Sequence, residues 1–219
     1  MDKMILFHGS KYIIEKPSFD YKNNNSDYGS GFYCTCDLES AKEWACRNSS
    51  NGIVNKYSLD IRNLKILDLT DSKYSIFHWL TLLIKNRIIT QQVYRYNKAV
   101  IDYLFENYSI DLSSYDLVIG YRADDAYFKF PIAFIEGRIS INQIEEVYRL
   151  GELGKQVVII SKKAFDKIKF LEFLEVSEDY HFKYRNRIIS ANTKLENLLS
   201  KERNIYEDTI IDIVRKSKK

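Results

Sequence analysis

The spacing of apolar residues along the chain predicts short strands interleaved with helices of uneven length. Short apolar or alternating runs indicate strands, which we expect at 4–8, 32–35, 53–59, 65–69, 116–120 and 157–160. A period of about 3.6 residues indicates helices, which we expect at 38–47, at two places within 74–108, and at 140–149, 161–169, 183–200 and 203–216. Because strands and helices do not alternate regularly, the pattern favours an α+β fold.

Composition and charge are those of an ordinary globular chain. The 219 residues are 45% apolar and 29% charged, a balance typical of a packed domain. Three cysteines, an odd number, and an N-terminus without signal-peptide character favour a cytoplasmic protein with free thiols. No apolar run is long enough to span a membrane, so we expect no membrane partner.

Generic catalytic and metal-binding motifs are missing from the sequence. Cys34 and Cys36 lack the Cys-x-x-Cys spacing of a zinc site, and no two histidines share metal-ligand spacing, so no metal is expected. Gly29-Ser30-Gly31 lacks the third glycine of a dinucleotide fingerprint, and no Gly-Lys-Ser/Thr of a P-loop occurs. A catalytic triad stays open because triads are recognised by geometry, although no serine lies in a nucleophile elbow.

Four short motifs nevertheless follow one another in a fixed order. They are His8-Gly9-Ser10, Gly31-Phe32-Tyr33-Cys34-Thr35, Ala41-x-x-Trp44-Ala45, and Val118-Ile119-Gly120 followed by Ala123-Asp124-Asp125. This order resembles the ADP-ribosyltransferases of the diphtheria-toxin and poly(ADP-ribose) polymerase type. Their pattern has a His on the first strand, a Gly-x-Gly-x-Tyr strand, an aromatic residue about eleven positions later and a Glu opening a late strand. Over roughly residues 4–170 the chain is most similar to a group of uncharacterised bacterial proteins assigned to that fold.

The resemblance implies a fold, a ligand and a set of binding residues. It implies an ADP-ribosyltransferase-like NAD-binding domain over 1–170, with a split antiparallel sheet, followed by a C-terminal helical extension over 171–219. NAD would lie in the cleft as co-substrate. The residues implied to bind it are His8, Gly9, Ser10, Gly31, Tyr33, Thr35 and Trp44.

Each of the main binding residues has a chemical reason within that resemblance. His8 would donate or accept a hydrogen bond at a ribose hydroxyl, with Ser10 as a supporting partner. The backbone N–H and C=O of Gly9 would pair with the nicotinamide carboxamide, since a residue without Cβ allows close approach. Tyr33 and Trp44 would enclose the nicotinamide ring. Ordinary core packing is the alternative for the two rings in a chain with 17 tyrosines.

The sequence departs from the family at the third catalytic position. Gln156 stands just before the strand 157–160, where the family has a glutamate. A glutamine can hold the ribose 2′-hydroxyl but brings no charge to the oxocarbenium-like transition state. Asp124 or Asp125 could supply that charge, or could only cap a turn. Gly154 replaces the second carboxylate of arginine-modifying relatives, which disfavours transfer to protein arginine. The catalytic residues implied are His8, Tyr33, Gln156, Asp124 and Asp125.

We therefore expect an NAD-dependent mono-ADP-ribosyltransferase that cleaves the nicotinamide–ribose bond and transfers ADP-ribose to an unidentified macromolecule, a protein or a nucleic acid. By resemblance its setting is that of a bacterial or phage toxin or conflict protein, with an antitoxin protein as a candidate partner. Two alternatives stay open. One is an NAD glycohydrolase, which uses the same site with water as acceptor. The other is a catalytically degenerate NAD-binding or interaction module, which Gln156 permits.

Overall fold

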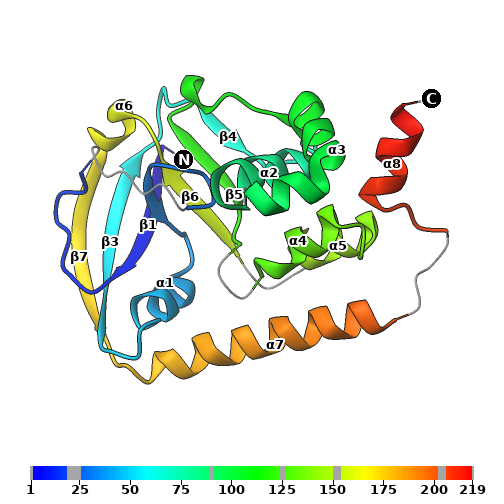
Figure 1. Cartoon of the computed structure of the whole chain (residues 1–219). Helices are drawn as coiled ribbons and strands as arrows, with labels where there is room; N and C mark the ends of the chain where they lie inside the picture. Colours follow the sequence, from blue (N-terminus) through cyan, green and yellow to red (C-terminus); the bar gives the residue numbers. More distant parts are fainter. Residues whose placement is uncertain are drawn as a thin grey trace.

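The computed structural model describes residues 2–18, 26–88, 91–123, 127–149, 154–201 and 206–218. Within these ranges, seven strands form two sheets and helices pack around them, which confirms the α+β class (Figure 1). The strands are β1 (Lys3–Ser10), β2 (Phe32–Cys34), β3 (Gly52–Asp60), β4 (Ile66–Asp68), β5 (Leu117–Tyr121), β6 (Lys155–Ile159) and β7 (Ile168–Val176). The helices are α1 (Leu38–Ala45), α2 (Ile76–Leu83), α3 (Gln91–Tyr108), α4 (Lys129–Ile135), α5 (Ile141–Arg149), α6 (Lys162–Phe165), α7 (Tyr180–Ser200) and α8 (Ile210–Ser217), with a π-helical turn η1 (Ile84–Ile88) and a 3-10 turn η2 (Leu112–Ser114).

The seven strands divide into a three-stranded and a four-stranded sheet. The first is antiparallel, in the order β1-β3-β7, and the second has the order β2-β6-β5-β4. In the second sheet β4 and β5 run parallel, so the expected fully antiparallel sheet is corrected to a mixed one. Parallel neighbours need a long crossover, and α2, η1 and α3 lie between β4 and β5 in the chain.

The two sheets meet where β1 passes β2. Phe7 N–H donates to the Thr35 carbonyl oxygen at 2.8 Å, and Thr35 N–H donates to the Phe7 carbonyl oxygen at 2.9 Å. This pair is an isolated antiparallel bridge rather than a continuous ladder. The edges of β1 and β2 therefore separate beyond it.

Helix α1 packs closely on β1. Asp37 caps the helix by accepting a hydrogen bond from Ser40 N–H at 2.8 Å. The buried Ala41 and Ala45 face the strand, and a Cβ on Gly9 would lie only 2.3 Å from the Ala41 carbonyl oxygen. Gly9 is therefore required for the helix to approach this closely.

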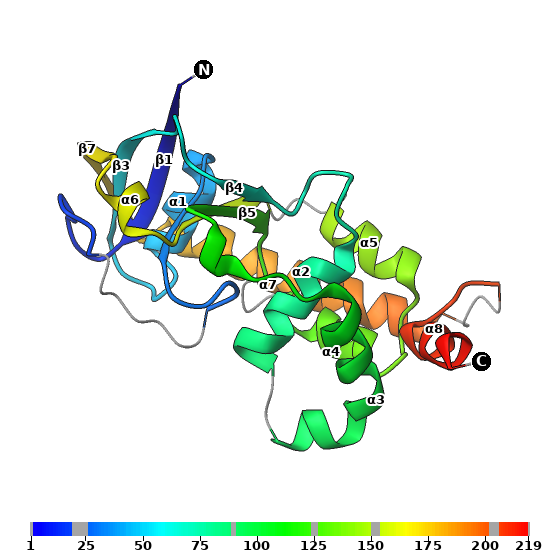
Figure 2. The same cartoon turned by 90° about the horizontal axis from the view of Figure 1, so that it is seen from above.

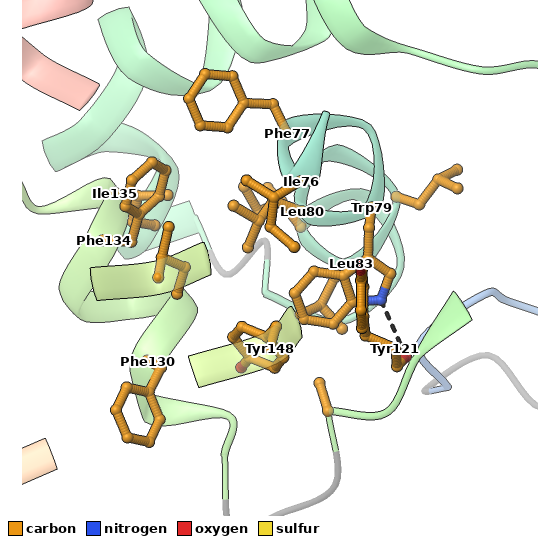
Figure 3. Packing of buried hydrophobic residues seen from close by; sticks show 14 of the residues in the cluster. Ile76, Phe77, Trp79, Leu80, Leu83, Tyr121, Phe130, Phe134, Ile135 and Tyr148 are labelled. Atoms are coloured by element: carbon orange, nitrogen blue, oxygen red, sulfur yellow. Dashed lines mark hydrogen bonds between the residues drawn. The ribbon is translucent and has the colours of Figure 1, made fainter. Parts of the chain in front are cut away.

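The largest hydrophobic cluster lies between the four-stranded sheet and the helices α2, α4 and α5 (Figure 3). Trp79 of α2 is fully buried there, and its Nε1 donates to the Tyr121 carbonyl oxygen at 3.1 Å. The Trp79 ring also packs against Tyr148 of α5, with centroids 4.3 Å apart. This cluster holds the C-terminal end of β5 in place, one residue before the Ala-Asp-Asp motif begins.

The chain after Ser161 differs from the predicted helix at 161–169. Helix α6 ends at Phe165, and the chain then forms β7, which pairs antiparallel with β3. Strand β7 lies at the edge of its sheet and most of it is exposed, so its sequence lacks the clean alternation of a half-buried strand. The domain boundary expected at residue 170 falls inside this strand.

The C-terminal helices contribute to the main core. Helix α7 runs along one side of the molecule, and α8 lies at the end away from β1, β3 and β7 (Figures 1 and 2). Ala191 and Leu195 of α7, and Ile210 and Val214 of α8, are buried in the same cluster as Trp79. No helix in the described ranges is long and apolar enough to cross a membrane.

Candidate functional site

The strands β1 and β2 bring His8 and Tyr33 into contact at the split between the sheets. His8 Nδ1 lies 2.7 Å from the Tyr33 carbonyl oxygen. A carbonyl oxygen only accepts hydrogen bonds, so Nδ1 carries the proton. Burial lowers the pKa of His8 against the opposing effect of this hydrogen bond, which favours the neutral ring. Its Nε2 is then an unprotonated acceptor, and no donor in the described ranges reaches it.

Gly9 directs its backbone N–H and C=O into the gap between β1 and β2, beyond the Phe7–Thr35 bridge. Consecutive residues of a strand direct these groups to opposite edges, and those of Phe7 bond to Thr35 of β2. The register of β1 with β3 is unbroken over this stretch, so Gly9 uses the same edge as Phe7. No partner among the described residues reaches either group. Gly9 therefore offers a donor beside an acceptor, the complement of a primary carboxamide.

The Tyr33 side chain is held by the turn that precedes β2. Its hydroxyl donates to the Gly29 carbonyl oxygen at 2.7 Å and accepts from Tyr28 N–H at 3.0 Å. Gly29 has a φ of 76°, in the left-handed region that favours glycine. Burial raises the pKa of the Tyr33 phenol, which keeps it neutral. The hydroxyl thus fixes the ring at this turn, where the ring packs against the main hydrophobic cluster.

Gln156 of β6 reaches a buried aspartate that the sequence did not reveal. Its Nε2 donates to Asp27 Oδ2 at 2.6 Å. Arg87 Nη1 donates to Asp27 Oδ1 at 2.7 Å, and Ala123 N–H donates to Asp27 Oδ2 at 3.0 Å. Burial raises the pKa of the Asp27 carboxyl, whereas Arg87 and the two other donors lower it. Asp27 lies in a polar stretch typical of an exposed loop, so no local pattern predicts its burial.

Trp44 lies on α1 with cations against its ring. The guanidinium carbon is 4.2 Å from the ring centroid for Arg47 and 5.1 Å for Arg122. Arg122 follows β5 directly and is buried, and sequence reasoning missed it because no motif includes it. Within the described part of the chain, Trp44 makes no ring contact with Tyr33. Enclosure of one ligand ring by both aromatics stays a prediction.

Two hydroxyl residues of the predicted set make local hydrogen bonds. Ser10 Oγ accepts from Tyr12 N–H at 3.0 Å, just after β1 ends. Thr35 Oγ1 donates to the Lys155 carbonyl oxygen at 3.2 Å, which links the end of β2 to the start of β6. Both side chains therefore brace the strand ends around the gap.

The remaining predicted site residues are Gly31, Asp124 and Asp125. A Cβ on Gly31 would lie 2.6 Å from Val158 Cγ1, so packing against β6 explains this glycine without a ligand. Asp124 and Asp125 lie outside the described residues.

No group of three or more potential metal ligands occurs in the part that is described. Two surface hollows, one lined by α3, α4 and α8 and the other by α5 and α7, contain no predicted site residue.

Comparison with known families places the chain in one of them. The model of the family described as "Protein of unknown function (DUF3990)" matches residues 4–170. Because this match covers most of the chain, the protein belongs to that family. No curated protein and no solved structure matches the chain.

Proposed function

We propose that the protein is an NAD-dependent mono-ADP-ribosyltransferase with an ADP-ribosyltransferase-like split-sheet core. The observation that carries this proposal is the unpartnered N–H and C=O of Gly9, which face the gap beside Tyr33 and His8. A donor and an acceptor on one glycine suit a carboxamide, and an adjacent aromatic ring suits the flat ring that bears it. Nicotinamide combines both features.

The remaining groups suit the ribose next to that ring. In this proposal His8 Nε2 accepts a hydrogen bond from a ribose hydroxyl, because its Nδ1 proton is committed to Tyr33. The bond between nicotinamide nitrogen and ribose C1′ breaks, and nicotinamide leaves with the electron pair. The acceptor then bonds to C1′ and loses a proton to solvent. Holding ribose and leaving group in fixed positions is the main contribution of such a site.

Gln156 takes the place of the glutamate that the family resemblance implies. It brings no formal charge to the transition state, and Asp27, the carboxylate to which it is hydrogen-bonded, is already paired with Arg87. This observation favours, as a second candidate, a module that binds NAD without turnover. Plain NAD hydrolysis uses the same groups with water as acceptor. The setting of a bacterial or phage toxin, with an antitoxin partner, rests on family resemblance.

The decisive experiment follows the label of adenylate-labelled NAD incubated with purified protein and a bacterial lysate. A transferase moves label to protein or nucleic acid and releases nicotinamide, and His8→Ala abolishes both. His181→Ala is the matched control, because His181 lies on α7 with its Nδ1 3.2 Å from the Cys46 carbonyl oxygen. Free ADP-ribose without labelled macromolecule indicates a glycohydrolase. NAD binding without either product indicates the non-catalytic module, and no binding at all overturns the proposal.

A further inference from the structure

The hydrogen bonds of Gln156 fix which end of its amide is turned toward Asp27 and which end is turned away from it. Nε2 lies 2.6 Å from Asp27 Oδ2 and 3.5 Å from the Tyr121 carbonyl oxygen, and both of these atoms are acceptors. The NH₂ end is therefore turned toward Asp27 and Tyr121. No donor in the described ranges reaches Oε1. The amide thus presents an oxygen, an acceptor, to whatever binds beside it.

Asp27 is itself held from several sides. Arg87 and Ala123 bond to its carboxylate, and Asn86 Nδ2 donates to its backbone oxygen at 3.2 Å. Asn86 and Arg87 both lie in the π-helical turn η1, a feature that often marks functional sites. Only 5% of Asp27 is exposed. The carboxylate therefore has a fixed position from which to orient Gln156.

We propose that Asp27 is a positioning residue, which orients the Gln156 amide so that its carbonyl oxygen accepts the ribose 2′-hydroxyl of NAD. The inference rests on the proposed function for the identity of the ligand. It assigns Asp27 no contact with NAD and no charge in the transition state, because Arg87 neutralises the carboxylate locally.

For Gln156→Glu, the geometry around Asp27 predicts the opposite of what family resemblance implies. By that resemblance, Gln156→Glu restores the family's glutamate and preserves or raises nicotinamide release. In the structure, a glutamate oxygen would replace Nε2 at 2.6 Å from Asp27 Oδ2. Two carboxylates at this distance cannot both be ionised, so the pair retains a proton or separates. Gln156→Glu should therefore lower nicotinamide release at pH 7, by about tenfold or more.

The first test needs no NAD. In a spectrum of glutamine side-chain amides, one Nε2 proton of Gln156 should be shifted downfield by the charge-assisted hydrogen bond. Gln143 is the internal reference, because no acceptor among the described residues is bonded to its Nε2. Asp27→Asn should remove the shift. Asp116→Asn, which changes another buried aspartate that accepts from Ser161 Oγ and Lys65 N–H, should preserve it. An unshifted Gln156 signal in the unmodified protein overturns the proposal.

The second test is rescue of nicotinamide release from NAD. Asp27→Asn removes the like charge, so the double variant Asp27→Asn/Gln156→Glu should release nicotinamide faster than Gln156→Glu. Asp116→Asn/Gln156→Glu should not, because Asp116 bonds to a different set of partners. Equal rates for all three variants, or full activity of Gln156→Glu, overturn the positioning role. If the unmodified protein neither binds nor cleaves NAD, the proposed function fails, whereas the amide spectrum still decides whether Asp27 orients Gln156.

Discussion

Tyr33→Phe separates the two roles that the structure gives to one side chain. The substitution removes the hydroxyl and leaves the ring in place. In the unmodified protein this hydroxyl bonds to the Gly29 carbonyl oxygen at 2.7 Å and to Tyr28 N–H at 3.0 Å. Its loss should loosen the turn before β2 without removing the surface on which a nicotinamide ring would stack.

The expected loss of stability follows from these two hydrogen bonds. Each contributes about 1 kcal/mol net, so their removal should cost about 2 kcal/mol of unfolding free energy. For a chain of this size, that corresponds to a fall in Tm of about 4–8 °C. Thermal unfolding followed by circular dichroism measures it. Tyr96→Phe is the matched control, because Tyr96 is 78% exposed and its hydroxyl makes no hydrogen bond with the described residues.

Nicotinamide release completes the test. Measured well below Tm, Tyr33→Phe should retain most of the activity, whereas Tyr33→Ala should lose it because the ring is gone. An unchanged Tm for Tyr33→Phe would refute the anchoring of the turn by the hydroxyl. Equal loss of activity in both variants would refute the stacking role of the ring.

Three further predictions test other parts of the site. His8→Ala should abolish nicotinamide release. Burial lowers the pKa of His8, so the unfolded chain binds a proton at this residue more tightly than the folded chain does. Activity and stability should therefore hold above about pH 6.5 and fall as the pH drops through the lower folded-state pKa. Higher activity or stability at acid pH would contradict a neutral His8. Gly9→Ala should lower the free energy of unfolding in urea by about 1–3 kcal/mol, since its Cβ would lie 2.3 Å from the Ala41 carbonyl oxygen; unchanged stability would contradict that contact. Trp44→Ala should raise the Kd for NAD by about two- to tenfold in a binding titration, the value of one stacking contact; unchanged affinity would exclude Trp44 from the site.

The sequence predicted the elements whose signals are local. The apolar run that ends at His8 and the aromatic strand around Tyr33 are marked by their own residues, and Asp37 marks the start of α1. Family resemblance then suggested that His8 and Tyr33 act together, which local patterning does not reveal. The structure joins them through one hydrogen bond, from His8 Nδ1 to the backbone carbonyl oxygen of Tyr33, while the His8 ring packs against Phe32.

Asp27 shows why the rest of the site was not predictable. Its side-chain partners, Arg87, Ala123 and Gln156, lie 60, 96 and 129 positions away in the chain. Nothing in a polar stretch signals that tertiary contacts will bury one of its carboxylates. The edge strand β7 escaped prediction for a related reason, since its pairing with β3 is long-range and its exposed residues carry no periodic signal.

A crystal structure of the protein soaked with NAD tests the central claim most directly. The nicotinamide carboxamide should lie within hydrogen-bond distance of both Gly9 N–H and Gly9 C=O, with its ring against Tyr33 and a ribose hydroxyl at His8 Nε2. NAD bound elsewhere on the molecule, or Gly9 left without a carboxamide in crystals that contain NAD, would contradict the account.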